Sequence, residues 1–434
     1  MNLERFIAGR AIQAGKQSFT RLIIVIATIA VALSLTVMIA TSALISGFKN
    51  EITDKIFGFW GHIHISDINS SRSLVEAFPL SKDENFIDAV KNIKAVEYLD
   101  YRRVLGFEFP DYAVQRETKG GIRHVQTFAM RPGIIQTKKQ IEGIILKGAG
   151  EEYNWEFFQN YLQEGEVLNP NDTTDTRKIL ISRYTADRLE TEVGKRFLVH
   201  FVDNGETVPL RFEIAGIYKT GLEEYDKKFA LVDLGVIQDL LGWGDHQVGG
   251  YEIFIENIDD LDVLSDYIDI EELPNHLYAE TIRQKFPPIF EWLNLQDLNE
   301  IVIMALMLVV CIINMITALL ILILERTKMI GVLKSLGAAD WSIRKIFLNY
   351  AGFIVINGLL WGNIIGIGLC LLQKYFGIIT LSEADYYLSV APINLNMWTI
   401  LALNIGTFLI TLFCLILPTW LVTRISPVKA IRFD

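Results

Sequence analysis

The chain has 434 residues, of which 51% are hydrophobic, with a mean hydropathy of +0.31 and a formal net charge of −11. It is therefore more apolar than an ordinary soluble domain, and its acidic excess argues against a nucleic-acid partner, because phosphate binding requires clustered Lys and Arg. Its three cysteines, Cys311, Cys370 and Cys414, all lie in apolar stretches, so no disulfide framework is expected between residues 49 and 298.

Residues 1–21 predict a short amphipathic helix on the cytoplasmic side of a membrane. Leu3, Phe6 and Ile7 share one face, and the flanking Arg10 and Arg21 favour the inside. The sequence AGKQS around residue 16 lacks the Ser or Thr and the upstream Gly of a phosphate-binding loop. We therefore expect no cofactor on this chain, so that any ATP and Mg would be bound by a partner.

Residues 22–48 predict the first membrane span, because they contain 27 uncharged residues and about 20 apolar residues suffice to cross the hydrocarbon. The stretch is too long for the core of a cleaved signal peptide, and no small-residue cleavage site follows it. We therefore interpret it as a permanent anchor.

Residues 49–298 predict a large extracytoplasmic domain with a net charge of −17. Phe86, Ile87, Val90 and Ile93 have helical spacing, and 182–189 also has a helical pattern. Strand patterns occupy 125–130, 179–182, 197–202, 210–217 and 251–256. Isolated helices among many short strands indicate an α+β fold, which we expect to form two subdomains.

Two groups of polar residues in this domain admit a site interpretation. His62 and His64 alternate with isoleucines, so a metal site is conceivable, but no third ligand is evident and an exposed strand face is the preferred interpretation. His124 with the acidic residues of GLEEYDKK (Glu223, Glu224 and Asp226) is the only cluster that hints at an enzyme, and a simple turn explains that segment better. We expect no catalytic or metal site.

Residues 299–324 predict the second span, and residues 325–345 a cytoplasmic loop with an excess of basic residues. Within this loop, Met329, Ile330, Val332, Leu333 and Leu336 form an apolar stripe at helical spacing. Gly337 suits a C-terminal cap. A short amphipathic helix that lies along the membrane is either an interfacial anchor or a docking surface for a cytoplasmic partner.

Residues 346–373 predict the third span, residues 374–396 an external loop, 397–423 the fourth span and 424–434 a cytoplasmic tail. In the third span, Gly358, Gly362 and Gly366 are four residues apart and predict close helix packing. Four asparagines lie at membrane depth, where bonding to a neighbouring helix is the usual role: Asn314, Asn357, Asn363 and Asn404. No ionisable residue lies in the middle of a span, so no ion or proton pathway is predicted.

Several segments resemble one family of membrane proteins. The loop ERTKMIGVLKSLGA and the closing LPTWLVTRISPVKAIRF are similar to the permeases of the MacB and FtsX group of ABC systems. The segments SGFKNEITDKIFGFWGHIHI, ILISRYTADRLETEVGKRF and AGIYKTGLEEYDKKFALVDL resemble, within that group, the lipoprotein-releasing permeases of LolC and LolE type. The resemblance covers nearly the whole chain.

The resemblance implies a non-catalytic permease subunit with a MacB-like periplasmic domain, located in the bacterial inner membrane. Its partners would be a cytoplasmic ABC ATPase dimer, a second permease chain that is identical or a sister, membrane lipids, a lipoprotein substrate and a periplasmic lipoprotein carrier. The loop 169–177 is a candidate for carrier binding by position only. The alternative from a different class is an FtsX-like scaffold that relays ATPase motion to a periplasmic partner.

The resemblance also implies two sets of site residues. The ATPase would receive the amphipathic helix through Glu325, Met329, Ile330, Leu333, Lys334, Leu336 and Gly337. The acyl chains of the substrate would lie between the first and second spans, against Leu35, Met38, Ile39, Met304, Leu308 and Val309.

Overall fold

The computed structural model describes residues 19–70, 78–82, 86–104, 107–136, 141–169, 177–203 and 206–424. Residues 1–18 of the predicted N-terminal helix, 170–176 of the loop proposed for carrier binding and 425–434 of the tail lie outside these ranges. The chain divides into two compact units. The membrane unit comprises residues 1–51, 291–380 and 390–434, and the α+β unit comprises residues 52–290 and 381–389.

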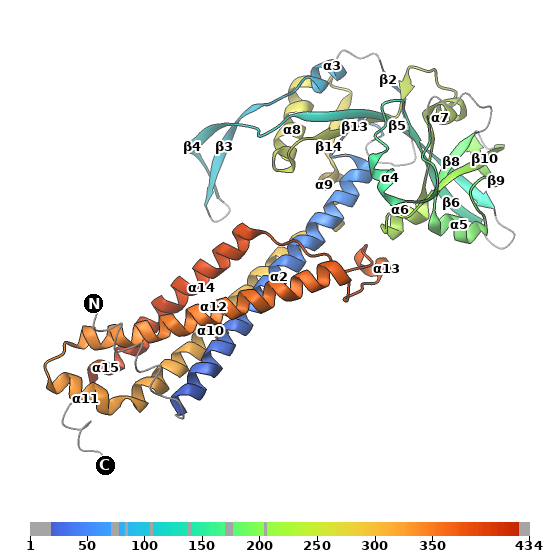
Figure 1. Cartoon of the computed structure of the whole chain (residues 1–434). Coiled ribbons are helices and arrows are strands. Elements are labelled where there is room, and N and C mark those ends of the chain that lie inside the picture. Colours follow the sequence, from blue (N-terminus) through green and yellow to red (C-terminus); the bar gives the residue numbers. More distant parts are fainter. Residues whose placement is uncertain are drawn as a thin grey trace. The chain divides into compact units, whose positions relative to one another are not determined.

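Four helices in the described part of the chain are long and apolar enough to cross a membrane: α2 (Phe19–Trp60), α10 (Pro287–Glu325), α12 (Asp340–Phe376) and α14 (Met397–Thr419). The short α11 (Thr327–Ser335) lies between α10 and α12 in the chain, and α15 (Leu421–Arg424) follows α14 (Figure 1). The four spans predicted from the sequence fall on these helices.

The first two of these helices run well beyond the apolar stretches that predicted them. Helix α2 continues through polar residues as far as Trp60, where Gly61 has a φ of +76° and its N–H donates to the carbonyl of Phe57 at 2.7 Å. Glycine suits this position because it has no Cβ to oppose a left-handed backbone. Helix α10 begins at Pro287, and proline is tolerated in a first turn because the N–H it lacks has no intrahelical partner there.

The α+β unit is built on a ten-stranded mixed sheet with the order β14-β1-β13-β5-β6-β11-β8-β10-β7, and β9 pairs with both β10 and β5. The strands are β1 (Ile63–Asp67), β5 (Ile122–Gln136), β6 (Ile141–Ala149), β7 (Leu162–Gly165), β8 (Lys178–Ser182), β9 (Arg196–Asp203), β10 (Glu206–Tyr218), β11 (Phe229–Asp233), β13 (Gly250–Ile255) and β14 (Leu277–Thr281). Two small sheets pair β2 (Leu80–Ser81) with β12 (Gln247–Val248) and β3 (Glu97–Val104) with β4 (Phe107–Glu117).

The pairings close six of these strands into a ring. Going round it, β5 pairs with β6, β6 with β11, β11 with β8, β8 with β10, β10 with β9 and β9 again with β5. Strands β13, β1 and β14 extend the sheet from the first half of β5, on the edge where β9 pairs with its second half. Where the sequence predicts two subdomains, the structure thus shows a closed ring and an open extension that share one strand. Closure removes the unpaired edges that would otherwise invite aggregation.

In the described part of residues 52–290, short α-helices accompany the sheet: α3 (Phe86–Lys91), α4 (Glu156–Tyr161), α5 (Arg183–Leu189), α6 (Glu223–Lys228), α7 (Leu234–Leu241), α8 (Leu261–Tyr267) and α9 (Ile282–Lys285). The α+β fold class and the strands and helices predicted above are confirmed. Helix α5 begins at residue 183 because the side chain of Ser182 accepts a hydrogen bond from the N–H of Thr185. Helix α9 has a full capping box formed by Thr281 and Gln284.

The external loop 374–396 is more than a connection between spans. Its central residues 381–389, which include α13 (Glu383–Tyr386), belong to the α+β unit, whereas its two ends belong to the membrane unit. In the sequence, Glu383 and Asp385 interrupt an otherwise largely apolar stretch between the two spans, and nothing indicates this division.

Candidate functional site

Helix α11 ends in the geometry that its glycine predicts. Gly337 has a φ of +88°, its N–H donates to the carbonyl of Lys334 at 3.0 Å, and the N–H of Ala338 donates to the carbonyl of Leu333, also at 3.0 Å. These two bonds are a Schellman cap, which satisfies carbonyls left free at a helix end. The cap gives the loop a defined turn before α12 begins at Asp340.

Part of the apolar stripe of α11, which is predicted from the sequence as a docking surface, is buried within the chain. Ile330 is fully buried in the core of the membrane unit, and Met329 and Leu333 are partly buried against that core. Lys334 is engaged within its own chain, since its ammonium lies 2.8 Å from the carboxylate of Asp340 and donates to the carbonyl of Thr423. Ile330 is therefore used in internal packing and Lys334 in polar contacts within the chain, and a docking role for these two residues stays a prediction.

The exposed apolar surface of α11 is smaller than the predicted stripe and lies toward the C-terminal end of the helix. Leu336 is 79% exposed and Val332 50% exposed, and Trp341 at the start of α12 is 51% exposed. Glu325, at the end of α10, is exposed as well. An exposed apolar pair on a capped, short helix is a surface that a partner or the membrane interface can cover.

Helices α2 and α12 approach closely at the three glycines of the predicted packing stripe. A Cβ added at Gly358 would lie 2.6 Å from the Cβ of Val31, and one at Gly362 would lie 2.9 Å from the Cβ of Leu35. At Gly366 the nearest atom of α2 would be 3.3 Å away. The hydroxyl of Thr36 also donates to the carbonyl of Gly362 at 3.2 Å. Small residues allow this approach because they leave room for the backbone and side chains of the neighbouring helix.

This packing bears on the residues predicted to line a lipid cavity. On α2, Leu35, Met38 and Ile39 are 0%, 4% and 1% exposed, and Leu35 and Ile39 lie against the glycines of α12. On α10, Met304 and Leu308 are half-buried and Val309 is 50% exposed. Leu35 and Ile39 therefore take part in helix packing within this chain, and the lipid cavity between the two sets stays a prediction.

Of the four asparagines at membrane depth, two bond to a neighbouring helix as predicted. Asn363 on α12 and Asn404 on α14 exchange side-chain hydrogen bonds of 2.7 and 3.0 Å. Asn314 and Asn357 instead donate to the carbonyls of Val310 and Phe353 in their own helices. The first pair fixes α12 against α14 at one level of the membrane.

In the α+β unit, a buried lysine holds the end of α2. The ammonium of Lys147 on β6 donates to the carbonyl of Phe59 at 2.6 Å and lies 2.7 Å from the carboxylate of Glu252 on β13. It also lies 5.0 Å from the ring centroid of Trp60. Lys147 and Glu252 are both fully buried. A positive charge is favourable here because the last carbonyls of a helix are unpaired and carry its negative dipole end.

Further polar groups complete this cluster. His64 on β1 hydrogen-bonds the carbonyl of Trp60 at 2.6 Å, and the amide of Gln126 donates to Glu252 at 2.7 Å. Burial lowers the pKa of Lys147 and raises the pKa of Glu252, and the attraction between the two groups opposes both shifts. Burial likewise keeps the pKa of His64 well below its usual value, so the ring is neutral and donates from Nε2 to Trp60.

The two histidines do not form an exposed strand face, so that interpretation is wrong. His62 is 7% exposed and packs against the ring of Phe57, and His64 is fully buried. The end of α2 covers the polar positions of β1, which the alternating pattern alone places in solvent. Among the residues described, no group of three His, Cys, Asp or Glu side chains could hold a metal ion.

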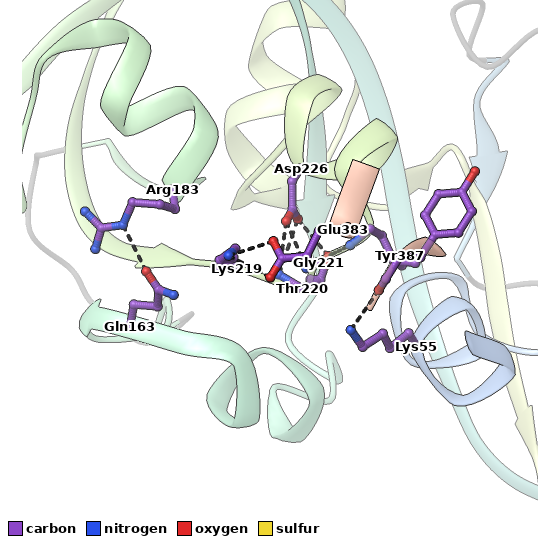
Figure 2. A network of polar contacts seen from close by, with 10 residues as sticks. Lys55, Gln163, Arg183, Lys219, Thr220, Gly221, Asp226, Glu383 and Tyr387 are labelled. Atoms are coloured by element: carbon purple, nitrogen blue, oxygen red, sulfur yellow. Dashed lines mark hydrogen bonds and ion pairs between the residues drawn. The ribbon is translucent and has the colours of Figure 1, made fainter. Parts of the chain in front are cut away.

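The segment GLEEYDKK forms a turn and the short helix α6. Asp226 is 5% exposed, and its carboxylate accepts hydrogen bonds from the N–H and hydroxyl of Thr220 and from the N–H of Gly221 (Figure 2). Gly221 has a φ of +79°, which the turn requires. His124 lies on β5 and hydrogen-bonds the carbonyl of Glu152. The contacts of His124 and of Asp226 therefore hold backbone segments in place.

Residues 381–389 contact the same turn. The ammonium of Lys219, next to Thr220, lies 2.7 Å from the carboxylate of Glu383, and Lys55 of α2 donates to the carbonyl of Tyr387 at 3.3 Å (Figure 2). The chain between the third and fourth spans is thus bonded both to α2 and to the turn before α6.

The Asp226 carboxyl predicts a pH dependence of stability. Burial raises the pKa of Asp226 to about 6, against 3.8 for an ordinary aspartate, while the bonds from Thr220 and Gly221 oppose the shift. Because the folded state holds the proton more tightly, the stabilisation is complete below pH 3.8 and is lost as the pH rises through about 6. Between pH 5 and 7 we expect a loss of about 1 kcal/mol from this group.

Thermal unfolding in detergent checks this expectation. The unfolding temperature of the natural chain should fall more steeply between pH 5 and 7 than that of Asp226→Asn. Asp259→Asn is the control, because Asp259 is exposed and the neighbouring Lys119 lowers its pKa. Equal slopes for the natural chain and Asp226→Asn would contradict the prediction.

Four long helices and one α+β domain inserted after the first of them define a class of integral membrane protein, the permeases with a large extracytoplasmic domain. Family comparisons specify the class. The family model described as "MacB-like periplasmic core domain" matches residues 24–265, and the one described as "FtsX-like permease C-terminal" matches residues 301–427. The chain belongs to the MacB- and FtsX-like permeases.

Curated relatives resemble the chain over nearly its full length. The lipoprotein-releasing system transmembrane protein LolC of Xylella fastidiosa (strain Temecula1) is 21% identical, over 96% of each chain. LolC of Neisseria meningitidis serogroup B is 21% identical over the whole of both chains, and LolE of Haemophilus influenzae is 22% identical over 99% of each. Within the permeases, the chain is therefore similar over nearly its full length to proteins named LolC and LolE.

Proposed function

We propose that this chain is the permease subunit of an ABC-type lipoprotein-releasing system in the bacterial inner membrane. It would extract lipoproteins from the outer leaflet with energy from ATP hydrolysis in a separate ATPase dimer, and pass them to a periplasmic carrier. The observation that carries the proposal is the full-length similarity to LolC and LolE, which includes both the membrane helices and the α+β domain. A second permease chain, identical or a sister, would complete the transporter.

The exposed end of α11 is the proposed docking surface for the ATPase. Leu336 and Val332 supply its apolar contact, and the cap at Gly337 fixes the direction of the loop behind it. Of the larger set predicted from the sequence, Ile330 and Lys334 contribute indirectly by holding the helix against the rest of the membrane unit.

The exposed face of α10 is the surface proposed for the acyl chains of the substrate. Val309 is half exposed on α10, with Met304 and Leu308 beside it, whereas Leu35 on α2 is fully buried and lies against Gly362 of α12. An apolar helix face that is open to lipid can also accept acyl chains. A second permease chain facing this surface would close it into a cavity.

The docking proposal predicts a loss of ATPase binding in Leu336→Ala. Truncation of one central apolar side chain in a small interface should weaken binding about tenfold. The measurement is co-purification of the ATPase with the detergent-solubilised permease at matched expression. Ile270→Ala is the control, because Ile270 is similarly exposed, at 74%, in the α+β unit. If ATPase recovery is the same for both variants, the end of α11 is not the docking surface.

The release of lipoproteins tests the function itself. Proteoliposomes that contain the permease and its ATPase should release an acylated lipoprotein to a soluble carrier when ATP is added, and not when a non-hydrolysable analogue replaces it. Binding of the ATPase without release of any lipoprotein would favour the FtsX-like scaffold, in which the motion serves a periplasmic partner instead.

A further inference from the structure

A cavity of about 250 Å³ lies in the membrane unit between the outer part of α2 and the beginning of α14. Its apolar floor is formed by Ile39, Ile400 and Leu403. Its polar lining comes from Ser42, Ser46, Asn50, Asn394, Asn396 and Thr399. The described residues that line it carry no charge, so the site has no counter-charge for a phosphate, a carboxylate or a cation.

The walls of the cavity are held in place by the chain that leads into α14. The N–H of Asn394 donates to the carbonyl of Ala43 at 3.0 Å, and the hydroxyl of Ser46 donates to the carbonyl of Asn394 at 3.3 Å. Gly47 allows this contact, since a Cβ there would lie 2.6 Å from the carbonyl oxygen of Pro392. The space is therefore a built feature of α2 and residues 392–396, and not a gap between loosely packed helices.

Two of the polar side chains that line this cavity form no hydrogen bond within the described residues. Ser42 is only 6% exposed, yet its hydroxyl forms no hydrogen bond within the described residues, and the same holds for the hydroxyl of Thr399. Among the described residues, neither hydroxyl oxygen is one of the fully buried atoms without a partner, so both stay accessible from the cavity. The neighbouring cation, Lys49, is engaged elsewhere, since its ammonium lies 2.6 Å from the carboxylate of Asp297. The lining thus offers hydrogen bonds to an uncharged acceptor.

The polar and apolar parts are ordered along α2 and α14, two of the helices long and apolar enough to cross a membrane. With a rise of 1.5 Å per residue, Ile39 lies about 10 Å deeper along α2 than Ser46, and Leu403 lies deeper along α14 than Asn396. A lipid in the outer leaflet has the same order, with its chain inward and its ester or amide carbonyls near the interface. The volume is below the roughly 300–1,000 Å³ of sites that enclose a whole small molecule, so the cavity suits one chain with its linkage.

We propose that this cavity binds a single acyl chain of a lipid, with the ester or amide carbonyl of that chain held by Ser42 and Thr399. Two sources carry this chemistry: a membrane phospholipid and the acylated end of a lipoprotein. The site is distinct from the exposed face of α10 proposed for the substrate, and it does not depend on the transport function.

Photo-crosslinking in proteoliposomes tests the proposal on the full chain. A phospholipid with a diazirine on one acyl chain should label peptides that contain Ile39–Ser46 and Ile400–Leu403. Ala43→Leu places a larger side chain in the cavity and should abolish this labelling, whereas Ala402→Leu, on an exposed face of α14, should leave it unchanged. Thr399→Val keeps the shape but removes the hydroxyl, and should lower labelling about fivefold.

A second arm identifies the source of the chain. A lipoprotein that carries the diazirine is added to vesicles of unlabelled phospholipid. Labelling by phospholipid that persists with excess lipoprotein indicates a resident membrane lipid, and labelling by the lipoprotein indicates a substrate chain; both support the site. Equal labelling of Ala43→Leu and the natural chain from both sources would overturn it, whether or not lipoproteins are released.

Discussion

Replacement of Lys147 by Ala is expected to destabilise the α+β unit strongly. It leaves the carboxylate of Glu252 buried without its ammonium, and it removes the donor from the carbonyl of Phe59 at the end of α2. Breaking one partner of a fully buried pair costs about 3–5 kcal/mol, because the remaining charge has neither water nor counterion. Since native domains are stable by only about 5–15 kcal/mol, the variant should accumulate poorly.

Tryptophan fluorescence during heating in detergent measures this effect, because Trp60 lies 5.0 Å from the Lys147 ammonium. Lys119→Ala is the control, since Lys119 forms an exposed ion pair with Asp259, and its loss should not change the unfolding temperature measurably. The double variant Lys147→Met with Glu252→Gln removes both charges and should recover part of the stability. If Lys147→Ala unfolds at the same temperature as Lys119→Ala, the buried lysine does not hold α2 in this way.

The features that the sequence predicts well are those that depend on neighbours in the chain. Length and hydropathy are sufficient for the spans, because a bilayer imposes a minimum apolar length. The stripe of Gly358, Gly362 and Gly366 indicates close packing because no other residue type lets a helix approach so near. The end of α11 at Gly337 follows from a single residue with a local role.

The features that it does not predict depend on contacts between distant segments. The apolar stripe of α11 has the correct spacing, but spacing does not tell which part faces the same chain, and Ile330 proves to be internal. The alternation around His64 is typical of a half-exposed strand, yet the end of α2 covers it and Glu252 lies 3.5 Å away. Lys147 and residues 381–389 carry no local signal, because their partners lie far away in the sequence.

Replacement of Gly358 by Ala is expected to disturb the packing of α2 against α12. The added Cβ would lie 2.6 Å from the Cβ of Val31 and 3.1 Å from the carbonyl oxygen of Thr28, so either the helices must separate or a side chain must leave its rotamer. Overpacking of this kind costs about 1–3 kcal/mol, which exceeds the roughly 0.5–1 kcal/mol that Ala gains over Gly in a helix. The variant should therefore lose stability despite the better helix former.

Gly368 gives the matched control on the same helix, because a Cβ added there meets no atom within 4 Å. Gly368→Ala should therefore be neutral or stabilising, and the difference between the two variants isolates the contact with α2 from helix propensity. Heating the solubilised proteins and following the monodisperse fraction by size-exclusion chromatography measures both. Larger side chains extend the test, since Gly358→Val should lose more than Gly358→Ala, whereas Gly368→Val should show only the modest cost of a β-branched residue in a helix. Similar unfolding temperatures for Gly358→Ala and Gly368→Ala would mean that α2 and α12 do not rely on this close approach.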